Sequence, residues 1–270
     1  MLLVRNDIMG SQQRESKKRI RRRIRGTFSL ILILIVFLLW GIYGLLQSDL
    51  MNVKVLEVSG NSICSEEEVI NVSQMIFNRN IFKYDLKDIK AKVESHPYIK
   101  VATVNRKLPN TLIINVKERK EYAIISYMGS FLYVDMEGVV LKISDSYLSN
   151  ELPLITGLKI ESLELGKRII ATEDTGLVNG LRLVEAAKLG DMLDAISEIN
   201  IKEADNLRLI TTDGIEVMLG LSKDPVYQML SLKEVLVKLY SMEKRDVIID
   251  MRYEHITVKD REIQEESNDG

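Results

Sequence analysis

The hydrophobic positions begin with one uninterrupted run. Phe28–Leu46 holds 19 residues without a charged side chain, and a helix of that length is roughly 28 Å long, close to the hydrocarbon thickness of a bilayer. A buried core helix would carry a polar stripe, which this run lacks. A secretory signal has a shorter apolar region and a small-x-small cleavage site, which Leu46-Gln47-Ser48-Asp49 does not supply. The run therefore predicts an uncleaved transmembrane helix, with Trp40 and Tyr43 at its exit-side interface.

The charge distribution gives this helix an orientation. Residues 1–27 hold nine Lys or Arg and two Asp or Glu, a balance of +7, so the rest of the chain carries −9 to reach the total of −2. Basic flanks stay in the cytoplasm, and we therefore expect residues 50–270 to lie outside. Contact with anionic lipid headgroups fits the same arm, and nucleic-acid binding is not expected. The basic residues nearest the helix are Arg21, Arg22, Arg23 and Arg25.

In residues 50–119 the spacing of the hydrophobic positions changes several times between that of a strand and that of a helix. Met51–Val58 predicts a strand, and Ser65 with Glu68 forms a capping-box pattern that opens a helix with Val69, Val72 and Ile76 on one face. The order strand, helix, helix, strand, strand predicts a small sheet covered on one face by two helices. The later segments are a helix from Leu86 to about His96-Pro97 and strands at Val101–Lys107 and Thr111–Glu118.

Residues 120–259 are β-rich with two predicted helices. Thr175–Leu189 is amphipathic and ends at Gly190, and Asp224-Pro225 opens a second helix. The chain as a whole is α+β, and the polar residues 260–270 predict a disordered tail. The predicted strands are Tyr122–Tyr127, Phe131–Val134, Val139–Ile143, Ser197–Ile201, Leu207–Thr211, Ile215–Leu219, Val247–Met251 and Ile256–Lys259.

Few residues in the sequence indicate catalysis or metal binding. One Cys and two His exclude an intramolecular disulfide scaffold and a zinc site made only of His and Cys. The GxGxxG, P-loop, HExxH and GxSxG patterns are missing. Cys64 has no His near it in sequence and is interpreted as a small hydrophobe, whereas Asp135, Glu137 and Asp213 are explained by turns. We therefore predict no catalytic residue, no cofactor and no metal.

Several motifs, in this order, resemble the FtsQ/DivIB family of bacterial division proteins. They follow one basic-flanked membrane helix, and the resemblance as a whole covers nearly all of the chain from Arg14 to Lys259. The matching segments are Val55-Leu56-Glu57-Val58-Ser59-Gly60-Asn61 leading to Ser65-Glu66-Glu67, His96-Pro97-Tyr98-Ile99-Lys100 through Leu108-Pro109-Asn110-Thr111, Val116-Lys117-Glu118-Arg119, Val134-Asp135-Met136-Glu137-Gly138-Val139 and Ile249-Asp250-Met251-Arg252-Tyr253.

The resemblance implies a POTRA domain at residues 50–119 and the family's β domain at 120–259. It also implies a non-catalytic divisome scaffold that binds the coiled-coil proteins FtsL and FtsB/DivIC and supports septal peptidoglycan synthesis, with the septal synthase as a further partner. Two stretches depart from the family pattern. Lys120-Glu121-Tyr122 replaces the usual Pro and small residue, and Lys202-Glu203-Ala204-Asp205 replaces a basic cluster seen in relatives.

The predicted partner-binding residues lie at the end of the chain. A last strand at a sheet edge can accept a partner's strand, and the resemblance places contact with FtsB at this segment. Arg252 could bind a partner carboxylate or pair internally with Asp250 or Glu254, and Tyr253 could contact the partner or cover the core. The predicted site comprises Arg252, Tyr253, Ile256, Thr257 and Val258.

Two other functions stay open at this point. A membrane-tethered cell-wall hydrolase or transferase would need a deep pocket with a charged pair in residues 120–259. A POTRA-type chaperone or secretion component would need a translocation barrel as a partner, and the sequence contains no barrel repeat.

Overall fold

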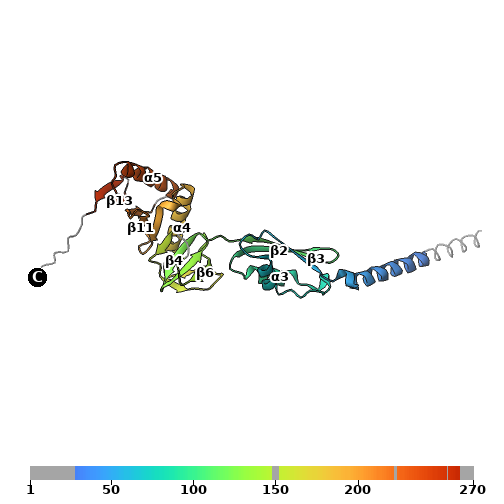
Figure 1. Ribbon diagram of the computed structural model, residues 1–270. Coiled ribbons are helices and arrows are strands. Elements are labelled where there is room, and N and C mark those ends of the chain that lie inside the picture. Colours follow the sequence, from blue (N-terminus) through green and yellow to red (C-terminus); the bar gives the residue numbers. More distant parts are fainter. Residues whose placement is uncertain (1–27, 148–151, 222–223, 254, 262–270) are drawn as a thin grey trace, which may run out of the picture. The chain divides into compact units, whose positions relative to one another are not determined.

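The computed structural model describes residues 28–147, 152–221, 224–253 and 255–261 (Figure 1). The described chain forms two compact units. The first comprises residues 28–57, Met75–Leu86 and Val104–Ile114, and the second comprises Val58–Gln74, Lys87–Thr103 and residues 115–261. Because these segments alternate along the chain, each unit is assembled from contacts distant in sequence.

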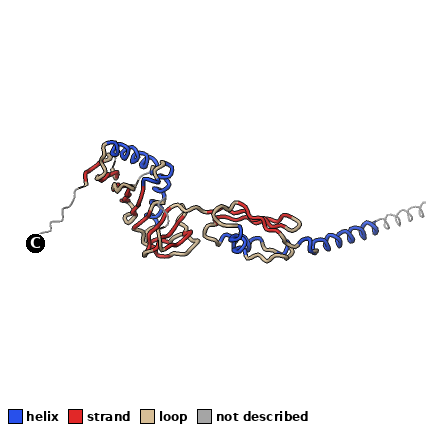
Figure 2. Tube along the Cα trace, viewed as in Figure 1, coloured by secondary structure: helices blue, strands red, loops and turns tan. Residues whose placement is uncertain are grey.

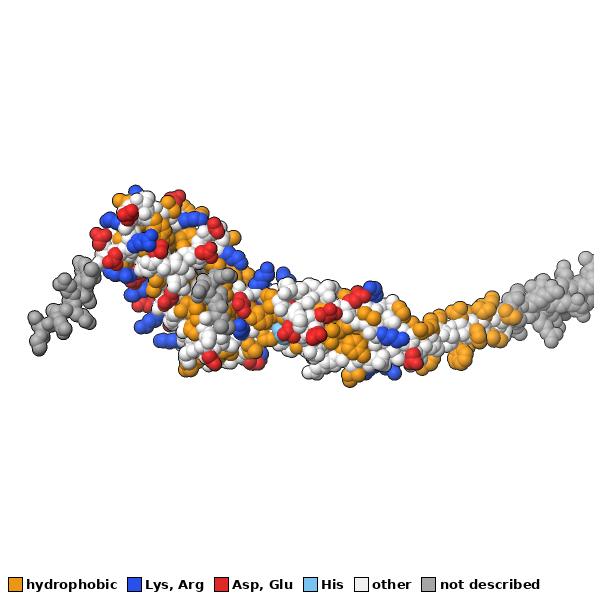
Figure 3. Space-filling view, in the orientation of Figure 1, with side chains coloured by type: hydrophobic (Ala, Val, Ile, Leu, Met, Phe, Trp, Pro, Cys, Tyr) orange, Lys and Arg blue, Asp and Glu red, His pale blue; other side chains and the backbone are white. Residues whose placement is uncertain are grey.

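The predicted apolar helix is present at Phe28–Gln47, with a mean hydropathy of 2.7 in its most apolar window. Its side chains are exposed along the whole length, including Trp40 at 71% and Tyr43 at 63%. Figure 3 shows hydrophobic side chains along this helix. Length and composition therefore suit a membrane anchor. Arg21, Arg22, Arg23 and Arg25 lie outside the described residues.

A three-stranded sheet has the order β1 (Val55–Ser59), β3 (Thr111–Glu118), β2 (Ile99–Lys107). The prediction that β1 begins at Met51 was wrong. Asp49–Met51 is a short 3-10 helix, η1. Asn52 forms an isolated bridge with Asn80, and the Val53 N–H donates to Arg79 O at 2.9 Å. The backbone here pairs with the loop before Ile81–Lys83, the 3-10 helix η2, so the sheet ladder starts later.

Two helices, α2 (Glu66–Ser73) and α3 (Leu86–Glu94), lie between β1 and β2 along the chain. The predicted capping box is confirmed, because Ser65 Oγ accepts from the Glu68 N–H at 3.2 Å and Glu68 Oε2 accepts from the Ser65 N–H at 2.8 Å. The prediction that Ile76 shares one face of this helix with Val69 and Val72 was wrong. The helix ends at Ser73 with Gln74 in the left-handed conformation (φ 51°), and Ile76 is 71% exposed.

The second sheet has nine strands in the order β14-β13-β12-β11-β10-β7-β4-β5-β6. Most predicted strands are confirmed within one or two residues. The strand β7 was missed, because it has only three residues directly after Pro153. It runs parallel to both β4 and β10 and joins strands β4 to β6 with strands β10 to β14 in one sheet. The bounds are β4 (Ala123–Tyr127), β5 (Ser130–Val134), β6 (Val140–Ser144), β7 (Leu154–Thr156), β10 (Ile196–Asn200), β11 (Asn206–Thr211), β12 (Glu216–Gly220), β13 (Val247–Met251) and β14 (Thr257–Asp260).

Two long helices pack on this sheet (Figures 1 and 2). They are α4 (Asp174–Leu189) and α5 (Pro225–Ser241), and they contact each other and share one core with the strands. Alternate residues of β11, β12 and β13 are buried, as expected of strands covered on one face. The remaining elements are η3 (Leu193–Ala195) and a small pair, β8 (Ile160–Ser162) and β9 (Ile170–Ala171).

Candidate functional site

The last strand, β14, forms one edge of the nine-stranded sheet. It pairs antiparallel with β13, with Thr257 opposite Asp250 and Val258 opposite Ile249. Among the described residues, its other side has no neighbouring strand. All four of its side chains are exposed. A strand with this environment offers backbone N–H and C=O groups to an incoming strand.

Arg252 is held beside this edge by Asp250. Its Nε and Nη2 atoms donate to Asp250 Oδ1 at 2.9 Å and Oδ2 at 2.6 Å, and its backbone N–H donates to Oδ1 at 3.1 Å. The hydrogen bonds from Arg252 keep the pKa of the Asp250 carboxyl below its usual value, although some burial opposes them. The guanidinium also lies 5.6 Å from the centre of the Tyr253 ring. The internal partner considered from sequence is therefore present, and Arg252 remains 33% exposed at its side chain.

Exposed apolar side chains surround Arg252. Tyr253 is 74% exposed, Ile256 39% and Val258 41%. An open groove of about 280 Å³ is lined by Arg252, Tyr253 and Ile256, and its wall also includes residues from the first turns of α5. Tyr227, which is 70% exposed, belongs to that wall and was missed from sequence. Its only sequence signal was its place outside the apolar stripe of α5. The groove lining also includes Gly220, Leu221, Gln228, Ser231 and Met251.

Cys64 and His96 meet in space although they are 32 residues apart. The Cys64 Sγ atom lies 3.6 Å from His96 Nδ1. Burial, followed by the negative charge of Glu118, raises the pKa of the Cys64 thiol to about 11. A thiol that stays protonated at neutral pH is a poor nucleophile. The geometry thus brings together a pair that sequence separation concealed, but it does not activate the cysteine.

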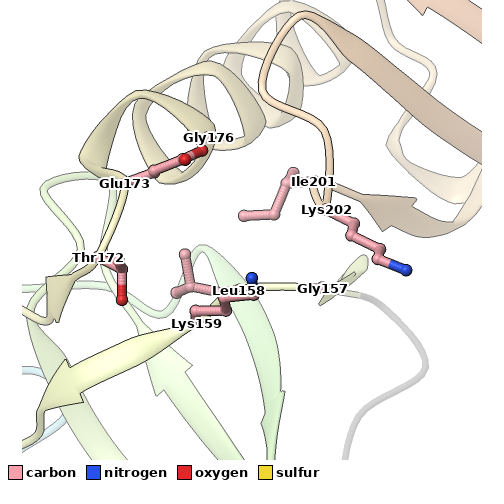
Figure 4. Close-up of a pocket in the computed structure, with 8 residues that line it drawn as sticks. All are labelled: Gly157, Leu158, Lys159, Thr172, Glu173, Gly176, Ile201 and Lys202. Atoms are coloured by element: carbon pink, nitrogen blue, oxygen red, sulfur yellow. The ribbon is translucent and has the colours of Figure 1, made fainter.

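The pocket in Figure 4 is small. It has a volume of about 90 Å³, and Glu173 is the single carboxylate among its lining residues. The Lys202 amine points away from the cavity that Leu158 and Ile201 line. Within the described residues, no group of three or more His, Cys, Asp or Glu side chains is arranged to hold a metal ion. Glu173 therefore has no second carboxylate in this pocket with which to form the pair that glycoside hydrolysis uses.

An ion-pair cluster near the start of β4 was also missed from sequence. Arg119 Nη1 pairs with Asp135 Oδ2 and, at 2.9 Å, with Glu137 Oε2, and Lys100 Nζ pairs with Glu137 Oε1. Asp135 Oδ1 also accepts from the Glu137 and Val139 N–H groups, each at 2.9 Å. Turn chemistry therefore explains part of the role of Asp135, as predicted. The ion pair to Arg119 depends on a contact across 16 residues.

These features define the class of the protein. One apolar helix suited to anchoring in a membrane precedes a mixed α+β region, and the candidate site is an exposed sheet edge. The sequence model described as "POTRA domain, FtsQ-type" matches residues 51–119. The model described as "Cell division protein FtsQ/DivIB, C-terminal" matches residues 123–252. The chain belongs to the FtsQ/DivIB family of cell division proteins.

Individual relatives agree with this assignment. The chain is 30% identical over 200 residues to the cell division protein DivIB of Clostridium tetani, covering 73% of this chain and 72% of that protein. It is 31% identical over 185 residues to the cell division protein FtsQ of Geobacter sp. (strain M21), covering 67% of this chain and 66% of that protein. The chain thus spans slightly less than two thirds of that FtsQ. The extracytoplasmic domain of DivIB from Geobacillus stearothermophilus gives a TM-score of 0.28 at 15% identity, over 47% of this chain and 96% of that domain, which is too low to inform the fold.

Proposed function

We propose that this chain is a non-catalytic, single-pass scaffold of the division septum. The helix at Phe28–Gln47 spans the cytoplasmic membrane, residues 1–27 stay inside with Arg21, Arg22, Arg23 and Arg25 against the lipid, and residues 50–270 lie outside. Residues 50–119 act as the POTRA domain and 120–259 as the β domain. The proposal rests on family membership, on the apolar helix and on the sheet edge at β14.

The proposed partners are FtsL and FtsB/DivIC, and through them the septal peptidoglycan synthase. The observation that carries this proposal is the exposed edge strand β14, flanked by Tyr253 and Ile256. A partner segment that adds a strand there gains main-chain hydrogen bonds, while the Tyr253 ring and the Ile256 and Val258 side chains lose contact with water. Thr257 contributes its backbone to the same edge.

The experiment compares the two edges of one sheet. The full chain, reconstituted in lipid nanodiscs, is titrated with the external coiled-coil segments of FtsL and FtsB/DivIC. Val258→Lys places a charge on β14, and Ile143→Lys places the same charge on β6 at the opposite edge. The two side chains are similarly exposed, 41% and 45%. We expect Val258→Lys to weaken binding at least tenfold and Ile143→Lys to leave it unchanged. A larger loss of binding for Ile143→Lys than for Val258→Lys would place the site at the β6 edge instead. Absence of saturable binding to the wild-type chain would refute the proposed partners.

The role of Arg252 needs its own comparison, because Asp250 already engages its guanidinium. Arg252→Gln removes both the internal pair and any partner contact, whereas Asp250→Asn weakens only the internal pair. If Arg252 contacts a partner carboxylate, Arg252→Gln weakens binding more than Asp250→Asn does. Equal losses would assign Arg252 to bracing the turn between β13 and β14. Tyr253→Ala tests the adjacent ring, with Met128→Ala, an 88% exposed side chain between β4 and β5, as its control.

A further inference from the structure

A loop beside the end of the apolar helix displays large hydrophobic side chains. Ile76 is 71% exposed, Phe77 42% and Phe82 47%, and all three belong to the segment Met75–Leu86 of the first compact unit. Leu50, in the short connection after the helix, is 59% exposed. Two phenylalanines and two aliphatic side chains left in water on one unit indicate a surface that another apolar medium covers.

The loop is braced, so these side chains do not simply fold into the core. Ile81 is fully buried and anchors the segment. Arg106 donates from Nε to Ile81 O at 2.9 Å and from Nη2 to Tyr84 O at 2.7 Å. The Phe82 N–H donates to Asn80 Oδ1 at 3.0 Å. The backbone on both sides of Phe82 is therefore fixed, with the ring outside.

The same loop is tied to the end of the helix. Asn80 Nδ2 donates to Leu46 O at 2.7 Å, one residue before the helix ends at Gln47. The Val53 N–H donates to Arg79 O at 2.9 Å, and the Asn78 N–H donates to Val53 O at 3.0 Å. These bonds hold the loop against the segment that leaves the helix, so the loop cannot move far from the point where a spanning helix would emerge.

Chain geometry then limits how far the aromatic rings can be from the bilayer. Phe82 follows Asn80 by two residues and Phe77 precedes it by three, which corresponds to at most about 7 Å and about 11 Å of backbone. The polar interfacial layer on each side of a bilayer is roughly 5–7 Å thick. With Asn80 bonded at the helix end, both rings are within reach of that layer, where aromatic side chains are favoured.

We infer that the loop Met75–Leu86 is a second membrane contact, in which Phe77 and Phe82 enter the headgroup–acyl boundary of the outer leaflet. The inference rests on the proposed membrane span and adds a lipid-binding surface outside it. The charge of the loop is compatible with a phospholipid surface, because Arg79 and Lys83 outnumber its single acid, Asp85. The contact restrains the first unit from turning about a single helix.

The test uses the single tryptophan of the chain. Trp40→Phe removes the native indole, and Phe82→Trp or Phe77→Trp in that background places one at the loop. Tyr227→Trp in the same background is the control, because Tyr227 is 70% exposed on α5 in the other compact unit. Each full-length variant is reconstituted in phosphatidylcholine–phosphatidylglycerol vesicles with and without brominated acyl chains. The measured quantity is the quenching of tryptophan emission by bromine.

We expect the brominated lipid to quench the emission of the Phe82→Trp variant several-fold more strongly than that of the Tyr227→Trp control, with Phe77→Trp showing the same direction. Wild-type Trp40 reports on the span separately. If Trp40 is quenched while Phe82→Trp and Phe77→Trp match the control, the lipid contact is refuted, the span stands and the apolar loop is left for a protein partner. If Trp40 itself is not quenched, the span is refuted and the inference falls with it.

Discussion

Glu118 tests whether a hydrogen-bonded carboxylate stabilises the folded chain. It ends β3, and its two oxygens accept four hydrogen bonds of 2.8 Å from the turn before α2. Oε2 accepts from the Ser62 N–H, the Ser62 hydroxyl and the Ile63 N–H, and Oε1 accepts from the Cys64 N–H. Burial acts to raise the pKa of this carboxyl, but the hydrogen bonds outweigh it and lower the pKa from 4.5 to about 2.

This change in pKa sets the expected magnitude. A pKa that falls from 4.5 to about 2 on folding corresponds to ~3 kcal/mol of folding free energy at neutral pH, and partial exposure makes this an upper value. Because the folded-state pKa is the lower one, the contribution is complete above the unfolded-state value and disappears as the pH falls toward about 2. Between pH 7 and pH 3 the wild-type chain should lose ~2 kcal/mol of this contribution.

Glu118→Gln removes the titration but keeps the size of the side chain. Urea unfolding of the full chain in mild detergent, followed by near-ultraviolet circular dichroism, gives the free energy of unfolding for both proteins at pH 7 and pH 3. We expect the variant to be less stable at pH 7 and the gap to narrow by ~2 kcal/mol at pH 3. Glu67→Gln, an exposed substitution in the first turn of α2, is the control and should change little at either pH. An equal gap at both pH values would refute the reasoning.

Two further pairs of substitutions test a close backbone approach and an ion pair. Gly60 (φ +85°) and Gly129 (φ +84°) share a left-handed backbone, but an added Cβ would lie 2.1 Å from Val116 O at Gly60 and has nothing within 4 Å at Gly129. We expect Gly60→Ala to lower the free energy of unfolding by ~3 kcal/mol and Gly129→Ala by ~1 kcal/mol, and similar urea midpoints would contradict the clash. Asp135→Asn removes the charge of the more buried of the two carboxylates that pair with the mostly buried Arg119, and should cost ~2–3 kcal/mol, against less than ~1 kcal/mol for Glu137→Gln at a 45% exposed side chain. Thermal unfolding measures both, and equal losses would contradict the burial argument.

Local signals in the sequence predicted local structure well. The Ser65–Glu68 capping box, the Asp224-Pro225 helix start and the alternation in Thr111–Glu118 each rest on contacts within a few residues, and each is present. The wrong predictions concern segments whose structure depends on residues distant in the sequence. Residues 52–53 left the predicted strand because they pair with the loop around Asn80, and β7 is three residues long and defined by its two neighbours.

The candidate site, too, was predicted in part from the sequence and in part is visible only in the structure. Sequence placed exposed residues at the last strand, and the sheet order makes that strand an edge. From the sequence, Arg252 could contact a partner or pair internally with Asp250 or Glu254. Only the structure shows that its internal partner is Asp250. Tyr227 could not be found from sequence, because it joins the groove beside Arg252 through the packing of α5 on β12 and β13.

Perturbed ionisable groups often mark functional sites, but the pKa shifts of Glu118, Asp250 and Cys64 have structural causes, even where the group lies beside the candidate site. The low pKa of Glu118 comes from hydrogen bonds that hold a turn, and the low pKa of Asp250 comes from Arg252, two residues later at the end of β13. The raised pKa of the Cys64 thiol comes first from burial, which makes the group less reactive. The proposed recognition depends instead on backbone groups at the β14 edge and on exposed apolar surface, such as that of Tyr253 beside this edge and of Phe82 beside the apolar helix.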